Sequence, residues 1–324
     1  MTTPAPATTS RSLAAPVFGV ILLLLFGFAF SEEVLTVVLE AVGRDDSAAP
    51  AVEIVVDAVT LLLVGLLKRR IDRIDGGGSG LWGWWWTGVV VILACDVVLV
   101  VLGGHPPVWL DQLIALLLAL AVGVVLTSSL NADPMTLLSA RRRAEMPLDW
   151  QRVRAVVPLV IGSYAAYAGA ALWWDYRSLD VMRQLDPAMA AAAQDIPLTF
   201  RGQFYVFSCW GAVSPRYFDQ MSYVIPLLLI TLGIEAGFFR RRRIDPVQRV
   251  ATGVTVLVMS LGLVGALSTL PWEGVGCGQV LSKWHEYIVF IVTLMAVFIG
   301  LTTLIWQLLV ARPDAEPDAP GGAD

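Results

Sequence analysis

The stretch Ala51–Asp72, which reads AVEIVVDAVTLLLVGLLKRRID, contains the features that decide the fold. A mostly apolar run from Ala51 to Leu67 carries two acids, Glu53 and Asp57, and ends at a basic group that begins with Lys68. A helix of about 17–25 such residues crosses the roughly 30 Å of hydrocarbon in a bilayer. Because Lys and Arg accumulate at the cytoplasmic ends of spans, the stretch predicts a transmembrane helix whose C-terminal end faces the cytoplasm.

The same pattern recurs along the 324 residues, of which 57% are hydrophobic and 15% charged. Soluble domains carry about 25% charged residues, so a single soluble domain is excluded. A net charge of −5 argues against nucleic acid as a partner. We expect an all-α polytopic membrane protein with eight spans: Leu13–Phe30, Ala51–Leu67, Trp86–Leu102, Leu110–Leu130, Val156–Trp174, Tyr223–Phe239, Thr252–Leu270 and Tyr287–Val310.

Basic residues predict the orientation of the chain in the membrane. With the N-terminus inside, 16 of the 22 Lys and Arg residues fall on the cytoplasmic side. We therefore expect both termini in the cytoplasm, in the cytoplasmic (plasma) membrane, with disordered tails at 1–12 and 311–324. The regions 13–174 and 223–310 hold spans one to five and six to eight. Cleavage of the first span as a signal peptide is an alternative that leaves the other orientations unchanged. The excess of Arg over Lys hints at a GC-rich bacterial source.

The segment 175–222 is the one long connection, and the topology places it outside the cell. A loop of this length without its own elements is unusual, so we expect a small extracytoplasmic cap that could hold a protein partner. Cys209 and Cys277 both fall on the outer side, where disulfides persist, and are candidates for a bridge. Cys95 lies within a span and is expected to be a buried thiol.

Small residues in two spans predict close helix packing. Gly162, Ala166 and Ala170 line one side of the fifth span. The seventh span carries Gly253, Ser260, Gly262, Gly265 and Ser268 in the same style. Seams of this kind let neighbouring helices approach closely, so a tight bundle is expected.

Acids inside spans are the candidate functional residues. Glu53 and Asp57 lie four residues apart, hence on one helical face, and Asp96 lies in the next span. Asp57 and Asp96 each lie about 9 Å below the outer end of their spans, so consecutive antiparallel helices could bring them together. A central acid costs about 2.5–3.5 kcal/mol on insertion. Such acids should face protein or water and form a proton or cation site. Alternatively, they bond to hydroxyl groups or line an external vestibule.

These residues lead to two principal hypotheses. The first is a proton- or cation-linked transporter that uses Asp57 and Asp96, with Glu53 at its outer mouth. The alternative is a non-catalytic membrane subunit or sensor that binds a partner through the 175–222 loop. No nucleotide- or cofactor-binding motif is present, and His105 and His285 lack metal-ligand spacing, so no cofactor or metal is expected. An enzyme acting at the outer face through His105, His285, Glu286 or Asp175 is disfavoured because no nucleophile–base spacing supports it.

Overall fold

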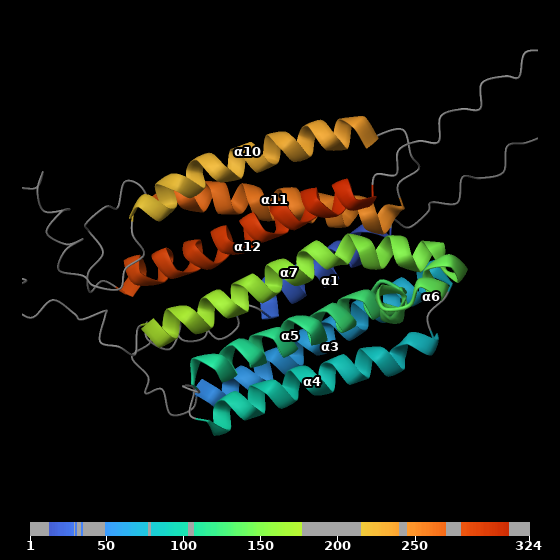
Figure 1. Cartoon of the computed structure of the whole chain (residues 1–324). Helices are drawn as coiled ribbons and strands as arrows, with labels where there is room; N and C mark the ends of the chain where they lie inside the picture. Colours follow the sequence, from blue (N-terminus) through green and yellow to red (C-terminus); the bar gives the residue numbers. More distant parts are fainter. Residues whose placement is uncertain are drawn as a thin grey trace, which may run out of the picture.

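The computed structural model describes residues 13–28, 30, 34, 49–76, 79–102, 107–176, 215–239, 245–269 and 280–310, which contain helices and no strand (Figure 1). The main helices are α1 (Ala14–Leu22), α3 (Ala49–Asp75), α4 (Trp82–Val101), α5 (Val108–Ser129), α7 (Pro147–Tyr176), α10 (Pro215–Phe239), α11 (Pro246–Thr269) and α12 (Val280–Val310). A π-helical segment, η1 (Leu23–Phe28), continues α1. The shorter elements are η3 (Ser79–Leu81), η4 (Pro134–Leu137) and α6 (Ala140–Glu145).

The main helices form two layers. In the first layer α4, α5, α7, α12, α11 and α10 follow one another as successive neighbours, from the bottom to the top of Figure 1. In the second layer α3 packs on α4 and α5, and α1 packs on both α3 and α11. The six helices of the first layer are the ones long and apolar enough to cross a membrane within the described residues.

Each of the eight predicted spans coincides with a helix of this bundle, which confirms the all-α class. The second-layer helices, α1 and α3, are not among the six that meet the length and hydropathy requirement. The apolar helix around α1 covers only Ala14–Gly27, and α3 carries Glu53, Asp57 and the basic residues from Lys68 onwards. The number of eight spans and the N-in orientation therefore stay predictions.

Several helices extend beyond the predicted spans. Helix α3 continues to Asp75, α7 begins at Pro147, and α10 begins at Pro215 rather than at Tyr223. Polar helical turns can project past the hydrocarbon because their backbone groups remain bonded within the helix. The predicted external connection of 175–222 is therefore helical at both margins, through Tyr176 and from Pro215. The expected cap between them falls outside the described residues.

Small residues set the packing between α7, α12 and α11, as predicted. A Cβ added at Gly169 would lie 2.6 Å from Leu294, and one at Gly162 would collide with Ile299. On α11, a Cβ at Gly262 would lie 2.8 Å from the Cβ of Ala296. Helix α12 thus fits between two small-residue seams. Gly253 differs from the expectation because no atom lies near its missing side chain.

Candidate functional site: buried charges at two levels of the bundle

The predicted acids on α3 belong to its buried stripe. Asp57 is 3% exposed. It lies at helical spacing from four other buried residues, which are Thr60, Leu61, Val64 and Lys68. Thr60 in turn faces η1, where a Cβ added at Gly27 would lie 3.7 Å from the Thr60 methyl carbon. Positions three, four and seven residues apart share a helical face, so Asp57 points into the bundle rather than towards lipid.

Asp96 occupies the equivalent position on α4. It is 6% exposed and continues the buried stripe that contains Trp85, Val89 and Ile92. Eleven residues separate Trp85 from Asp96, close to three full helical turns, so the two side chains share a face. Trp85 packs against α3, where a Cβ added at Gly65 would lie 3.0 Å from the Trp85 ring. Asp96 therefore lies on the side of α4 that faces α3.

Two contacts fix the register between these helices. Trp85 meets Gly65, and the Lys68 Nζ lies 5.1 Å from the centre of the Trp82 ring, so α3 and α4 are antiparallel. At 1.5 Å per residue, Asp57 lies about 12 Å along α3 from Gly65. Asp96 lies about 16 Å along α4 from Trp85, in the same direction. The two acids, hereafter the acid pair, therefore lie at levels less than one helical turn apart. Glu53, one turn beyond Asp57, is half-buried.

At the opposite end of α3, a second group of charges surrounds the C-terminus of α5. Helix α5 ends in a left-handed turn at Asn131, whose φ is 55°, and the Ala132 N–H bonds back to the Thr127 carbonyl at 3.1 Å. This arrangement satisfies some of the last carbonyls of a helix but leaves others open. Lys68, 0% exposed, donates to the Ser128 carbonyl at 2.8 Å and contacts the Asn131 side-chain oxygen at 3.3 Å.

Arg152 from α7 closes the same helix end from the other side. Its guanidinium donates to the Leu130 carbonyl at 2.9 Å and to the Asp75 carboxylate at 2.6 Å. It also lies 3.5 Å from a carboxylate oxygen of Asp245, which precedes α11. One buried cation therefore joins the ends of α3 and α5 to the start of α11. Positive charge at a helix C-terminus is favourable because the unpaired carbonyls carry partial negative charge.

We refer to Lys68, Asp72, Asp75, Asn131 and Arg152 as the α5 cluster. Asp72 completes it by bonding to both Lys68, at 3.2 Å, and the indole N–H of Trp82, at 3.0 Å. The hydrogen bond from Arg152 holds the pKa of Asp75 below its usual value. The cluster thus pairs cations with carboxylates and helix-end carbonyls, which makes it a junction between helices.

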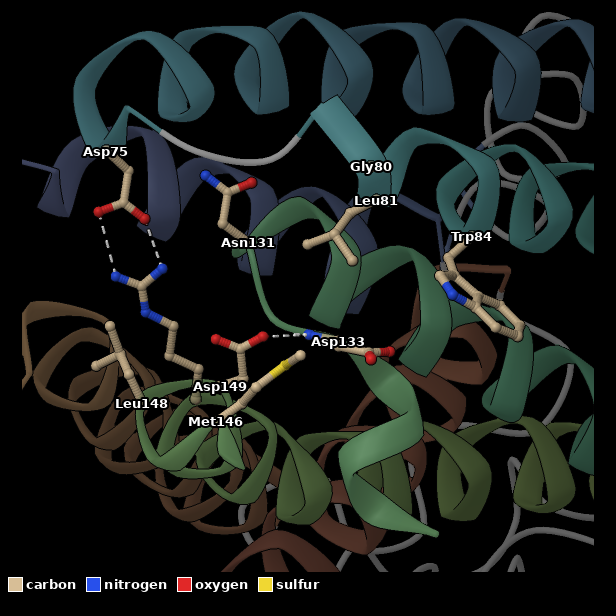
Figure 2. Close-up of a pocket in the computed structure, with 10 residues that line it drawn as sticks. Asp75, Gly80, Leu81, Trp84, Asn131, Asp133, Met146, Leu148 and Asp149 are labelled. Carbon is tan, nitrogen blue, oxygen red and sulfur yellow. Dashed lines mark hydrogen bonds and ion pairs between the residues drawn. The ribbon is translucent and has the colours of Figure 1, made fainter. Parts of the chain in front are cut away.

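An open cavity of about 510 Å³ lies beside this cluster, and Figure 2 shows its lining. Three acids contribute to the wall, and each is engaged within the protein. Asp75 binds Arg152, Asp149 accepts the Asp133 backbone N–H at 3.0 Å, and Asp133 pairs with Arg142. Within the described part of the chain, no group of three or more His, Cys, Asp and Glu side chains could hold a metal ion.

Sequence reasoning placed Asp57 and Asp96 inside the bundle but missed the α5 cluster. Lys68 and Arg152 are among the basic residues counted on the cytoplasmic side, and the structure shows that both are buried. For Lys68 a signal existed, because it falls on the same helical stripe as Asp57. For Arg152 none existed, since its partner Asp75 is 77 residues away along the chain.

The cysteine predictions have different outcomes. Cys95 is a buried free thiol on α4, as expected. Cys209 and Cys277 lie outside the described residues, so their bridge stays a prediction. Of the two histidines, His285 bonds to the Ser268 hydroxyl at 2.9 Å, and His105 lies outside the described residues.

The residues that the structure describes contain six long apolar helices in one bundle, which indicate a multi-pass α-helical membrane protein. No protein-family model, no curated protein and no solved structure matches the chain.

Proposed function

We propose that the protein is a proton- or cation-linked transporter of the cytoplasmic membrane, with the acid pair as its ion site. The observation that carries this proposal is the burial of Asp57 and Asp96 on neighbouring antiparallel helices, at levels less than one turn apart. Acids within a membrane bundle are costly, and they commonly mark ion pathways and proton relays.

The charges of the acid pair favour a mobile ion over a fixed structural role. Two carboxylates at neighbouring levels repel each other unless they share a proton or bind a cation. Among the residues that the structure describes, the buried cations Lys68 and Arg152 bind their partners at the far end of α3 and α5. Lys68 is eleven residues from Asp57, about 16 Å along the helix. A proton or small cation from solution is the counter-charge that this proposal assigns to the acid pair.

Glu53 fits the role of an outer access residue. It is half-buried and lies one turn from Asp57, towards the end of α3 that we expect outside the cell from the predicted orientation. An ion arriving from that side would meet Glu53 before the acid pair. Thr60, buried one turn further in, offers a hydroxyl on the inner side of Asp57.

The test uses the full chain in proteoliposomes, with proton flux followed by an internal pH dye under imposed pH, Na⁺ and K⁺ gradients. Asp57→Asn and Asp96→Asn should each abolish ion flux while leaving expression and helicity intact. Asp219→Asn, at an exposed acid on α10, is the matched control and should leave flux unchanged. Unchanged flux in both acid-pair variants would overturn the proposal. Loss of a partner complex on deletion of residues 180–215, with flux unaffected, would favour the partner-binding alternative.

A further inference from the structure

The outward face of α3 carries an apolar strip that becomes basic at one end. Val55, Val59, Leu62 and Leu66 are exposed along this face, and the same face continues into exposed Arg69, Arg70 and Arg73. The spacing of three and four residues keeps the whole series on one side of the helix. The change from leucine to arginine marks the level at which hydrocarbon gives way to lipid headgroups.

Helix α4 extends this strip into a two-helix surface. Gly65 on α3 contacts Trp85 on α4. Leu66 is the next residue after Gly65, and Trp86 is the next residue after Trp85. Because the helices are antiparallel, those following residues project on the same side of the pair. Leu66 is 51% and Trp86 is 56% exposed, and Val90 continues the apolar surface along α4. Helices α3 and α4 therefore present a continuous apolar surface, which lies on the hydrocarbon side of the arginines.

The arginines on this face differ from four other basic residues of the structure. Lys68, Arg141, Arg142 and Arg152 each form an ion pair with an acid. Within the described residues, Arg69, Arg70 and Arg73 form no ion pair with an acid. The Arg69 guanidinium instead lies 5.7 Å from the centre of the Trp82 ring, and the Trp82 N–H is bonded to Asp72. The Trp82 ring that Arg69 stacks on is therefore held in position by Asp72 of the α5 cluster.

We propose that this face of α3 and α4 is a binding site for an anionic phospholipid. The phosphate group would bind to Arg69 and Arg73, which lie four residues apart on one face and offer forked donors suited to phosphate oxygens. An acyl chain would lie along Leu66, Trp86 and Val90. Basic residues beside transmembrane helices attract anionic headgroups, whereas a zwitterionic headgroup lacks the net charge that they complement. This site is independent of the ion site in the acid pair.

The site is tested by lipid binding to the purified full chain in neutral detergent, measured by native mass spectrometry. Phosphatidylglycerol should bind as a resolved complex, and phosphatidylcholine should bind more weakly. Each basic residue near an anionic surface contributes about a fivefold change in affinity. Arg69→Gln with Arg73→Gln should therefore weaken phosphatidylglycerol binding by about twenty- to thirtyfold. Glycerol phosphate, added in place of lipid, separates a lipid site from a site for free phosphate and should not bind measurably.

The matched control removes the same charge elsewhere. Arg141→Gln with Arg249→Gln alters two exposed arginines on α6 and α11 and should leave phosphatidylglycerol binding within about twofold of the parent protein. Arg69→Lys with Arg73→Lys keeps the charge but loses the forked geometry, so an intermediate affinity is expected. Equal losses in the Gln double variant and the control, or no loss in either, would overturn the proposal. Tight binding of glycerol phosphate would also contradict a lipid site.

Discussion

The acid pair and the α5 cluster both bury charge in one helical bundle, but they balance it differently. The α5 cluster sets Lys68 and Arg152 against carboxylates and the final carbonyls of α5. The acid pair brings two groups of like charge to neighbouring levels. Burial alone therefore does not mark a functional site. Where opposite charges meet, the structure gains a fixed junction, and where like charges meet, we propose that an exchangeable ion binds.

The largest expected effect is on the junction. Arg152→Gln should lower the free energy of unfolding by about 3–5 kcal/mol, because it leaves Asp75 and the Leu130 carbonyl without their cation. Urea unfolding of the protein in detergent, followed by tryptophan fluorescence, measures the loss. The same measurement on Asp57→Asn should show no destabilisation, since that change removes a buried like charge. Equal destabilisation by the two variants would contradict the view that the α5 cluster stabilises the fold and the acid pair does not.

A smaller loss is expected at Lys68. Lys68→Met keeps most of the side-chain volume but removes the ammonium group, so the Ser128 carbonyl keeps only the Asn131 N–H and Asp72 keeps only the Trp82 N–H. A buried group that loses its only hydrogen bond costs about 1–3 kcal/mol, and the bonds that remain from Asn131 and Trp82 should keep the total near ~2 kcal/mol. Thermal unfolding by circular dichroism gives the value. A gain in stability would mean that desolvation of Lys68 outweighs its bonds.

The pH dependence of stability should separate the regions further. The pKa of Asp75 is lowered in the folded protein, so its ion pair with Arg152 contributes fully above the ordinary Asp pKa of about 4. That contribution is lost as the pH falls through the lower, folded value. Unfolding midpoints between pH 7 and pH 3 should therefore decline less steeply for Asp75→Asn than for the parent protein. Parallel curves would exclude Asp75 as a source of acid sensitivity.

The smallest effect is expected at the exposed pair of α6. Arg141 and Glu145 lie 2.7 Å apart, but their side chains are 87% and 51% exposed. Exposed helical pairs of this spacing contribute about 0.3–0.5 kcal/mol. Arg141→Gln should thus shift the unfolding midpoint barely above experimental error. A shift comparable to that of Lys68→Met would show that the stabilisation by this ion pair depends more on its short distance than on its burial.

Much of the fold followed from local patterns in the sequence. Apolar runs predicted every main helix, and small residues such as Gly162 and Gly262 predicted close packing, which the structure shows against α12. The cost of a carboxylate in hydrocarbon also predicted that Asp57 and Asp96 face protein or water rather than lipid. These features are local because they depend on residues within a few turns of one another.

The α5 cluster could not be predicted because it depends on the register between distant helices. Lys68 meets Ser128 across 60 residues, and Arg152 meets Asp75 across 77. Sequence alone treats such cations as solvated ends of spans. One local signal was available: Asn131 follows an apolar helix and precedes Pro134, a position that favours a left-handed helix end. That signal predicts the turn but not the cations that close it.

The most direct test of the acid pair is its protonation state in a membrane. Infrared difference spectra of the protein in lipid, at neutral pH and without metal cations, separate protonated from ionised carboxyl groups. The account predicts a protonated carboxyl band in the parent protein that disappears in both Asp57→Asn and Asp96→Asn and persists in Asp219→Asn. A band unchanged by both acid-pair substitutions, or no such band in the parent protein, would contradict a shared proton.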